Sequence, residues 1–509
     1  MCKPTKSSIT LAGMSTLKIS DGVVKDEVLV LGLTSTNSKG GLAIETGEMA
    51  IDTKTVLAQL NDMGATGKAD EVIKVPGTHV RLLVFTGLGS KSAQYTHENL
   101  RRAAGAASRA LAGNSSATFS LPAKSLQEVA AVAEGAALGA YSFTEFRGST
   151  KADFKAPLKT ITIHSKLASS AEAKAAVTRA AIIAKYTYLV RDLINTPPSH
   201  LTPDSFTKKM AAVVKAAGGA KSGLKVQIWD EKQLKSQGFG GIIGVGQGSA
   251  NPPRLLHISY TPKGKASKRY AYVGKGITFD TGGLALKPAA GMEAMKSDMS
   301  GAAAVSAAVV AIAELKLNVA IDAWAPLAEN MPSDTATRPS DIITIFGGKT
   351  VEVLNPDAEG RLVLADALMK AQSSKNALDG IVDVATLTGA QVVALGTRTS
   401  AVMTNNPDFS EAFMKVAALS GEQFWPMPLP EELRASLDSP VADLANIGDR
   451  MGGMLVAGLF LKDFVAPELP WLHLDIAGPA YNEAKPHGYT PVGGTGVSLR
   501  SLVTLAEQG

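Results

Sequence analysis

Short apolar runs rich in Val and Ile alternate along the chain with longer Ala-rich segments, and this alternation restricts the fold more than any other feature. Short runs of β-branched residues are typical of strands, whereas apolar residues at helical spacing over longer segments indicate helices. Strands separated by helices predict parallel or mixed sheets with helices packed on their faces. We therefore expect an α/β protein.

The first part of the chain is expected to form its own domain. Its predicted strands are 27–33, 81–86, 117–121 and 160–164, and its predicted helices are 98–112, 125–141 and 171–194. Asn195-Thr-Pro-Pro follows the last helix, which must end there because proline cannot continue it. With 509 residues, the chain is long enough for two or more domains. We place an N-terminal domain at 1–175, a linking helix at 176–195 and a second domain at 196–509.

The second part repeats the alternation on a larger scale. Its predicted strands are 224–229, 255–260, 269–274, 319–327, 380–386 and 471–476, and its predicted helices are 302–315, 359–372, 409–419 and 454–464. In such a sheet, ligands bind in the loops that follow the carboxyl ends of the strands. Candidate functional residues are therefore sought in those loops.

Cysteine and histidine usage limits the kind of metal chemistry available. Cys2 is the only cysteine, which excludes an intramolecular disulfide and a cluster of thiolate ligands. The seven histidines are scattered and form neither a His-Glu-x-x-His motif nor a His-x-His pair. Any bound metal would therefore depend mainly on carboxylates.

No membrane association is expected. The apolar stretch 301–313 is shorter than the roughly 20 residues that a spanning helix needs. The opening residues, MCKPTKSSITLAG, lack the apolar core of a secretory signal, and their two lysines without arginine give little support to a mitochondrial presequence. We expect a soluble cytoplasmic protein and leave a mitochondrial pool open.

Charge is distributed unevenly. Residues 1–194 hold 23 lysines and arginines against 16 acidic residues, whereas the rest of the chain is slightly acidic. A basic face of this kind could meet nucleic acid. Because arginines and aromatic residues do not interleave there, an ordinary solvated surface is the favoured interpretation.

The first group of candidate site residues lies in and after the segment Val273-Gly-Lys-Gly-Ile-Thr-Phe-Asp-Thr-Gly-Gly283. An apolar strand delivers Lys275 and Asp280 into a glycine-rich loop that continues to Lys287, and Asp298 precedes an Ala-rich helix. The segment does not match the Gly-x4-Gly-Lys-Ser/Thr spacing of a phosphate loop. The alternative interpretation is a simple turn, with Asp298 as a helix N-cap.

The second group lies in Asn355-Pro-Asp-Ala-Glu-Gly-Arg-Leu362. Asp357 and Glu359 are two positions apart, so in extended chain they project to the same side and could share a cation. Arg361 follows and could hold an anion. Taken alone, this segment fits helix capping better, because acidic residues stabilise a helix N-terminus.

Together the two groups carry more weight than either alone. Asp280, Asp298, Asp357 and Glu359 supply four carboxylates at strand-to-helix connections, and a cluster of them would repel and raise the pKa of each. Two divalent cations would neutralise the cluster, and oxygen donors suit zinc, manganese or magnesium. Lys275 would then be either an ion-pair partner or an uncharged amine ligand.

These motifs identify a resemblance. The segment 355–362 closely resembles the Asn-Thr-Asp-Ala-Glu-Gly-Arg-Leu signature of the leucyl (cytosol) aminopeptidase family, with Pro356 in place of threonine, and 273–283 resembles a second family signature. Further matches are Arg191-Asp-Leu-Ile-Asn-Thr-Pro-Pro, Gly244-Val-Gly-Gln-Gly-Ser, Ala385-Thr-Leu-Thr-Gly-Ala and His473-Leu-Asp-Ile-Ala-Gly. The resemblance covers 190–505, and the first 175 residues match only in general α/β character.

The resemblance implies a fold and a function. It implies an N-terminal macro-like α/β domain and a larger C-terminal zinc-peptidase domain with a central mixed sheet. It also implies a homohexamer, arranged as a dimer of trimers, that hydrolyses peptide substrates from the N-terminus and prefers Leu or other apolar residues. The metals would be zinc or manganese, with magnesium or cobalt as further options, and they would share the attacking hydroxide.

The resemblance also implies residue roles. One metal would be held by Asp280, Asp357 and Glu359, and the other by Lys275, Asp280, Asp298 and Glu359. Lys287 would be the catalytic electrophile, and Arg361 would hold a bicarbonate anion that moves the proton to the leaving amine. Substrate-pocket positions would be Met295, Asn355, Thr386 and Gly389, although each of these also fits an ordinary core or turn.

Two further functions stay open from the sequence. The first is a nucleic-acid-binding or architectural protein with secondary peptidase activity, which salt-dependent binding to duplex DNA would reveal. The second is a di-metal phosphoesterase, which the scarcity of histidines and a lysine ligand argue against.

Overall fold

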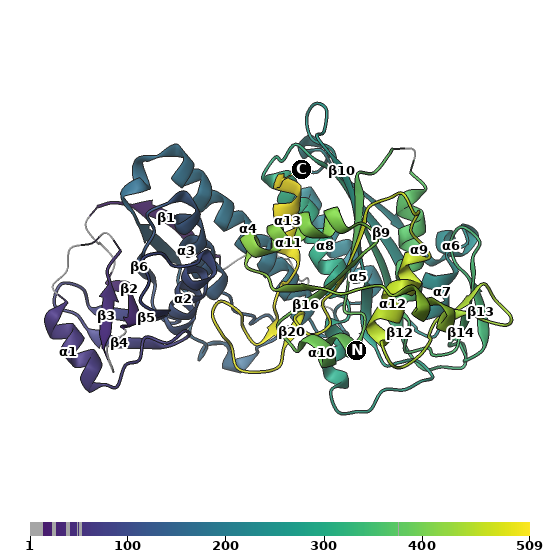
Figure 1. The fold of residues 1–509 in the computed structure, drawn as a ribbon, viewed down its shortest axis with the longest axis horizontal. Helices are drawn as coiled ribbons and strands as arrows, with labels where there is room; N and C mark the ends of the chain where they lie inside the picture. The colour runs from purple at the N-terminus through teal and green to yellow at the C-terminus, as the bar shows by residue number, and fades with distance from the viewer. Residues whose placement is uncertain are drawn as a thin grey trace. The chain divides into compact units, whose positions relative to one another are not determined.

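The computed structural model describes residues 14–22, 27–36, 41–47, 49, 53–374 and 376–508. The chain forms two compact units, of which the first comprises Met1–Tyr188 with Glu483–Val492 and the second comprises Leu189–Asn482 with Gly493–Gly509 (Figure 1). Both units are built from a sheet with helices, which confirms the predicted two-domain α/β fold. The division at 1–175, 176–195 and 196–509 concerns independently folding parts and stays a prediction.

The first unit contains a mixed sheet in the order β1-β7-β6-β2-β5-β4, with β3 paired to β2. Its strands are β1 Thr16–Ser20, β2 Val28–Ser35, β3 Leu42–Glu45, β4 Val72–Pro76, β5 Leu82–Ser90, β6 Ser116–Ser120 and β7 Thr160–His164. Its helices are α1 Lys54–Asp62, α2 His97–Ala110 and α3 Leu126–Gly139, and α4 Ala171–Asn195 begins in it. Pairing is parallel except for β3 and β4, which run antiparallel to their neighbours.

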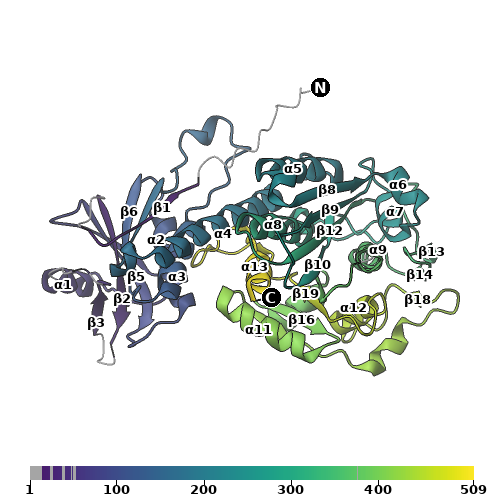
Figure 2. The same ribbon diagram turned by 90° about the horizontal axis from the view of Figure 1, so that it is seen from above.

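Local sequence signals explain where the helices of the first unit begin. Ser125 and Glu128 form a reciprocal capping box at the start of α3, and the Thr96 side chain accepts a hydrogen bond from the first turn of α2. Ala-rich α2 and α3 share one apolar core with the sheet, and α1 packs in a separate core on the opposite face (Figure 2). The sheet is therefore covered on both sides, as parallel strands require.

The second unit contains a larger mixed sheet in the order β17-β16-β19-β15-β10-β12-β9-β8, with β11 paired to β12. The strands of this sheet are β8 Leu224–Trp229, β9 Arg254–Tyr260, β10 Arg269–Gly274, β11 Gly276–Asp280, β12 Ala320–Asn330, β15 Gly380–Ala385, β16 Ser400–Thr404, β17 Phe424–Pro426 and β19 Trp471–Asp475. Smaller sheets contain β13 Asp341–Thr344, β14 Thr350–Val353, β18 Leu444–Ala445, β20 Tyr481–Asn482 and β21 Gly493–Gly494. The helices are α5 Pro203–Ala216, α6 Glu231–Ser236, α7 Gly240–Gly246, α8 Ser300–Glu314, α9 Gly360–Gln372, α10 Gly389–Leu395, α11 Pro407–Ser420, α12 Gly453–Lys462 and α13 Leu499–Gln508.

Helices cover both faces of this sheet (Figure 2). The helices α7, α9 and α12 share one large apolar core with β10 and β15, while α8 packs against β10, β12 and α13 on the other side. The central strands β19, β15, β10 and β12 run parallel, so their carboxyl ends meet at one edge. The segments after β10 and β15, which carry Lys275 and Thr386, leave the sheet at that edge, whereas the turn with Asp357 and Glu359 follows β14 of a smaller sheet.

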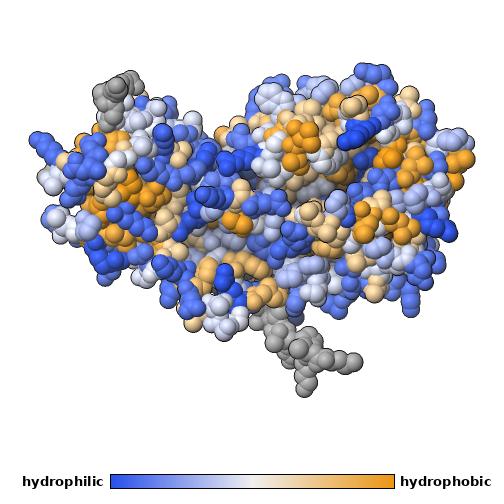
Figure 3. Space-filling model, turned by 90° about the horizontal axis from the view of Figure 1, so that it is seen from below, coloured by the Kyte–Doolittle hydropathy of each residue, from blue (hydrophilic) through white to orange (hydrophobic). Residues whose placement is uncertain are grey.

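One segment within the described residues has the length and mean hydropathy of a membrane span. This segment, Met292–Glu314, includes α8, and 94% of its most apolar window is buried inside the structure. A helix of this kind belongs to the core of the second unit, because both the sheet and α13 pack on it. On the face drawn in Figure 3, apolar residues form separate patches among hydrophilic ones.

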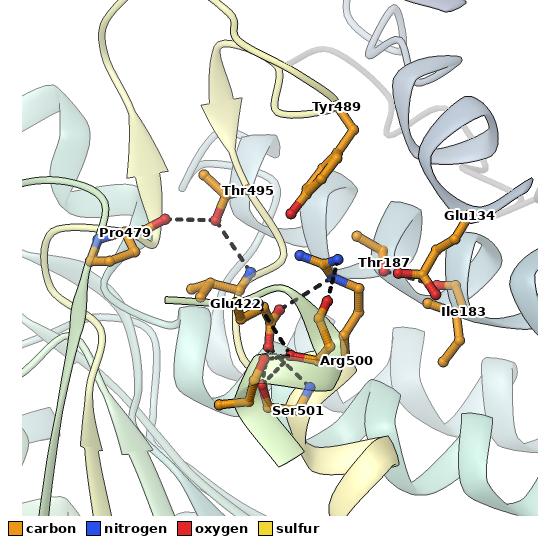
Figure 4. A network of polar contacts seen from close by, with 12 residues as sticks. Glu134, Ile183, Thr187, Glu422, Pro479, Tyr489, Thr495, Arg500 and Ser501 are labelled. Carbon is orange, nitrogen blue, oxygen red and sulfur yellow. Dashed lines mark hydrogen bonds and ion pairs between the residues drawn. The ribbon is translucent and has the colours of Figure 1, made fainter. Parts of the chain in front are cut away.

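A buried polar network holds the C-terminal helix α13 in the second unit (Figure 4). Glu422 accepts hydrogen bonds from the backbone N–H of Ser501 (3.0 Å) and from its hydroxyl (2.6 Å). Arg500 donates to the Ser420 carbonyl (2.7 Å), and its guanidinium lies 3.6 Å from Glu422. Because every one of these side chains is buried, the network fixes α13 against α11 and hence against α8.

Candidate metal centre

Glycines allow the elements that carry the site to approach closely. A Cβ atom at Gly274 would overlap the backbone of Gly301 at the start of α8, and one at Gly301 would overlap the Val384 carbonyl in β15. The Lys275 N–H donates to that same carbonyl (2.9 Å). The glycine-rich sequence therefore brings β10, β15 and the N-terminus of α8 together directly behind Lys275.

Lys275 lies between two predicted metal ligands. Its Nζ is 2.8 Å from Asp298 and 2.8 Å from Glu359, and it donates to the Thr386 carbonyl (2.9 Å). Burial lowers the pKa of this ammonium, but the charges of Asp298, Glu359 and Asp280 outweigh burial and raise the pKa above its ordinary value. The side chain is 4% exposed, so these contacts are shielded from solvent.

Lys287 pairs with the other carboxylates. Its Nζ is 2.9 Å from Asp280 and is in close contact with Asp357. Burial lowers its pKa, while the charge of Asp280 and the hydrogen bond to Asp357 raise the pKa above the usual value for lysine. The two lysines thus contact different carboxylates, and only Lys287 is partly open to solvent, with 22% of its side chain exposed.

Three of the four predicted carboxylates lie close together. Oxygen atoms of Asp280, Asp357 and Glu359 all lie within 4.8 Å of one another. Burial, to which the charge of Asp280 adds, raises the pKa of Glu359 to about 8 against the attraction of Lys275. Burial likewise raises the pKa of Asp298 to about 6 and raises that of Asp357. The cluster therefore costs free energy when it is ionised without further cations.

Helix capping does not explain these residues. The N-cap of α8 is Met299, and Asp298 instead accepts from Thr386 (2.7 Å) and Lys275. Glu359 occupies the N-cap of α9, but its side chain makes no capping hydrogen bond. Both capping alternatives are wrong for the same reason, namely that each of these two carboxylates contacts Lys275 and makes no capping hydrogen bond to its own helix.

The donor set fits divalent metal ions. One oxygen each of Asp298, Asp357 and Glu359 is buried and accepts no hydrogen bond of good geometry, although each lies near a lysine ammonium. Buried carboxylate oxygens normally accept well-formed hydrogen bonds, whereas these oxygens have only a lysine ammonium beside them and keep capacity for a cation. Carboxylate oxygens converging in this way match what zinc, manganese and magnesium accept.

Arg361 lies in the first turn of α9, just beyond Glu359. It donates to the Asn446 carbonyl (2.8 Å), and its guanidinium carbon is 5.9 Å from the centroid of the Phe460 ring. Burial lowers its pKa to about 10. Its Nε has no hydrogen-bond partner among the described residues, so the cation keeps donor capacity for an anion.

The four predicted pocket residues are placed differently. The Asn355 side chain accepts from the Asp357 N–H (2.9 Å), and Thr386 contacts both Asp298 and Lys275. Gly389 opens α10, is exposed and has open space where a Cβ would point. Met295 is half-buried in the 3-10 helix Met292–Ser297, and its carbonyl accepts from the Asp298 N–H (3.2 Å).

Sequence reasoning missed three buried residues that hold the site segments. Asn330 donates to Asp280 (2.8 Å), and Asn446 accepts from the Leu354 N–H (2.8 Å). Asp475 accepts from the Leu387 N–H (3.1 Å) and the Thr388 hydroxyl (2.8 Å). The available signal was a polar residue at the end of an apolar strand, which Asn330 and Asp475 both are.

Fold and site together define a class of protein. Acidic side chains and two lysines converge at the carboxyl edge of a mixed sheet, which is an arrangement suited to metal-dependent hydrolysis. A family model described as "Cytosol aminopeptidase family, catalytic domain" matches residues 188–503, and the model of the family's N-terminal domain matches 30–150. The chain belongs to the cytosol aminopeptidase family.

Similar proteins agree over nearly the whole chain. A "Probable cytosol aminopeptidase" of Streptomyces avermitilis is 51% identical over 514 residues, which cover 98% of each chain. Another, of Micrococcus luteus, is 48% identical over 92% of this chain and 93% of its own. Among solved structures, the bottromycin maturation enzyme BotP in complex with Mn has a TM-score of 0.82 at 35% identity, covering 95% of this chain and 99% of its own. A mutant of tomato leucine aminopeptidase has a TM-score of 0.83 at 29% identity, covering 99% and 98%.

The protein is thus a metal-dependent aminopeptidase of a two-metal family. The predicted family, fold class and leucyl aminopeptidase function are confirmed at the level of the family. The nucleic-acid-binding alternative gains no support from any of these similarities.

Proposed function

We propose that this enzyme releases N-terminal residues, preferably Leu or other apolar residues, from peptides, and that five side chains bind its two metal ions. The observation that carries the proposal is the convergence of Asp280, Asp357 and Glu359 within 4.8 Å, with no side-chain capping hydrogen bond at the start of α9. The site residues that the sequence suggested lie on four separate segments of the chain, and helix capping does not account for their proximity.

The proposed ligand sets follow the observed neighbours. Asp280, Asp357 and Glu359 would hold one ion, and Asp280, Glu359, Asp298 and Lys275 the other. When bound, two divalent ions lower the pKa of water toward neutrality and polarise the carbonyl that is attacked. Asp280 and Glu359 are the most buried of the acids, each 2% exposed, which suits residues shared by both ions.

The two lysines are proposed to have opposite charge states in the working enzyme. Lys275 is surrounded by carboxylates whose charge two metal ions would neutralise, so we expect it to coordinate as an uncharged amine. Lys287 faces the partly open side and keeps its proton, so its ammonium would stabilise the oxyanion that forms from the peptide carbonyl.

Arg361 is proposed to bind a bicarbonate anion that moves a proton to the leaving amine. Support comes from its burial, its retained positive charge and its free Nε donor next to the acidic turn. Met295, Asn355, Thr386 and Gly389 would line the pocket for the N-terminal side chain, since Met295 and Asn355 adjoin ligands in sequence and Thr386, three residues before Gly389, contacts Asp298 and Lys275. A methionine wall adapts readily to Leu and Met side chains.

The native metal, the oligomeric state and the cellular location are proposals as well. Zinc or manganese is favoured as the native metal, with magnesium or cobalt as further options, and a similar structure is described as a complex with Mn. We infer a homohexamer that acts on peptide substrates in the cytoplasm, in keeping with relatives named cytosol aminopeptidases.

The proposal is tested by comparing leucine p-nitroanilide with its N-acetylated form, using chelated protein reconstituted with Mn²⁺ or Zn²⁺. We expect hydrolysis of the free-amine substrate alone, because the amine would contact a metal ion that a blocked substrate cannot reach. Equal hydrolysis of both substrates, or full activity after exhaustive chelation, would overturn the proposal. A size-exclusion measurement of mass in solution tests the hexamer separately.

A further inference from the structure

Asn330 is the last residue of β12 and is 5% exposed, and neither ligand set includes it. In the parallel pairing of β11 with β12, Asn330 stands directly beside Asp280. Its backbone carbonyl accepts from the Thr281 N–H (3.0 Å) and the Thr281 hydroxyl (2.8 Å). The main chain of Asn330 therefore holds the turn that follows Asp280.

The side-chain amide of Asn330 joins two segments that are far apart in sequence. Its Nδ2 donates to Asp280 Oδ1 (2.8 Å) and to the Pro356 carbonyl (3.1 Å), which immediately precedes Asp357. An amide group has two N–H donors, and both are used here. A Cβ at Gly283 would lie 2.8 Å from Asn330 Oδ1, so the turn has room for the amide only because it carries glycine.

The consequence for Asp280 is a fixed orientation. Oδ1 of Asp280 accepts from Asn330 and from the Gly282 N–H (2.8 Å), and Oδ2 faces Lys287 (2.9 Å). With Oδ1 engaged by two neutral donors, Oδ2 is the oxygen of Asp280 that faces a cation. The same amide sets how far the turn bearing Asp357 lies from the end of β11.

We propose that Asn330 is a positioning residue of the metal centre, which orients Asp280 and fixes its spacing from Asp357. This inference rests on the proposed function. Groups that orient metal ligands typically contribute 10–100-fold to metal affinity. The ion held by Asp280, Asp357 and Glu359 depends on this spacing, whereas the ion that also uses Lys275 and Asp298 depends on it less.

The test compares Asn330→Ala with a matched change, Asn405→Ala. Asn405 also bridges two segments of the second unit, since its side chain donates to the Leu469 carbonyl (2.9 Å) and accepts from the Trp471 N–H (2.9 Å). Neither of these contacts involves a carboxylate of the cluster. Mn²⁺ binding to chelated protein is measured by calorimetry and by electron paramagnetic resonance, and thermal unfolding of the metal-free protein is followed in parallel.

We expect two Mn²⁺ binding events in the wild type and in Asn405→Ala. In Asn330→Ala, one event should weaken at least ~10-fold and the other much less. Both variants should lose thermal stability in the metal-free state, because each removes a buried hydrogen-bonding side chain. Asn330→Leu, which is close in size but has no donor, repeats the measurement should the alanine variant not fold.

If the Mn²⁺ affinity of Asn330→Ala is unchanged, Asn330 has only a structural role and the inference is overturned. Equal weakening of both events would overturn the claim that Asn330 fixes the Asp280–Asp357 spacing, because an effect on Asp280 alone reaches both ligand sets. If the proposed function is wrong, the result is different: the wild type itself shows no pair of Mn²⁺ binding events, and the inference then fails with the proposed function.

Discussion

Replacing Gly360 by alanine should inactivate the enzyme without unfolding it. Gly360 is the first residue of α9, and a Cβ there would lie 2.7 Å from both Cδ and Nζ of Lys275 and closer still to its Cε. Ordinary Cβ contacts begin near 3.4 Å. The end of the Lys275 side chain must therefore move by roughly 1 Å, and misplacement on this scale costs about 10²-fold in rate.

The stability of the protein should change little or even rise. Alanine is more favourable than glycine in a helix by up to about 1 kcal/mol. The atoms in the way belong to the far end of a flexible side chain rather than to backbone, so they can shift at small cost to the fold. What is lost is the 2.8 Å placement of Nζ beside Asp298 and Glu359.

The assay measures kcat/KM on leucine p-nitroanilide, the melting temperature and the bound metal. Gly453→Ala is the control, because Gly453 is also the first residue of a helix, α12, and a Cβ there would meet only Ala390, at 3.9 Å. Its activity should stay within about twofold, as for an ordinary neutral change. Wild-type activity in Gly360→Ala would refute the claim that catalysis requires the observed position of the Lys275 side chain. A large fall in its melting temperature would refute the claim that the substitution disturbs only this side chain and not the fold.

Three other predictions concern individual residues of the second unit. Lys287→Ala should lower kcat by at least ~10²-fold while metal content stays unchanged, and normal turnover would remove Lys287 from the mechanism. Asp357→Asn should lose metal and activity together, which full occupancy by elemental analysis would contradict. Burial lowers the pKa of His473, but the charge and hydrogen bond of Asp383 (2.5 Å) raise it above 6.5 overall. The folded state therefore binds the His473 proton more tightly than the unfolded state does. The stabilisation of the fold by protonated His473 is full below pH 6.5 and is lost as pH rises through the folded-state pKa. His473→Asn should accordingly lower the melting temperature more at pH 6 than at pH 8.5, and an equal loss at both would show that His473 does not titrate there.

Much of the fold was predictable because its signals are local. The strand predicted at 160–164 is β7, Thr160–His164, and the one predicted at 224–229 is β8, Leu224–Trp229. Strands β1, β3 and β4 were missed, because four or five residues with mixed exposure leave no continuous apolar run. The segment after Lys275 was expected to be loop, but Gly276–Asp280 forms β11, since Gly276 lets the chain approach the Pro326 carbonyl of β12.

The sequence also supplied the chemistry of the site. Four carboxylates and two lysines in and after two short motifs, with one cysteine in the whole chain, already indicated metal binding by oxygen ligands. The same residues were compatible with helix capping, because capping is decided within one turn of chain and metal binding is decided between distant segments. The sequence alone could not choose between them.

Tertiary structure made that choice. It determined that Lys275 pairs with Asp298 and Glu359, that Lys287 pairs with Asp280 and Asp357, and that neither helix receives a capping hydrogen bond from its acidic side chain. It also brought in Asn330, which no motif includes. The physical reason is that residue type and local propensity set what each segment is able to do, whereas the direction of a buried side chain depends on packing between strands and helices that are far apart along the chain.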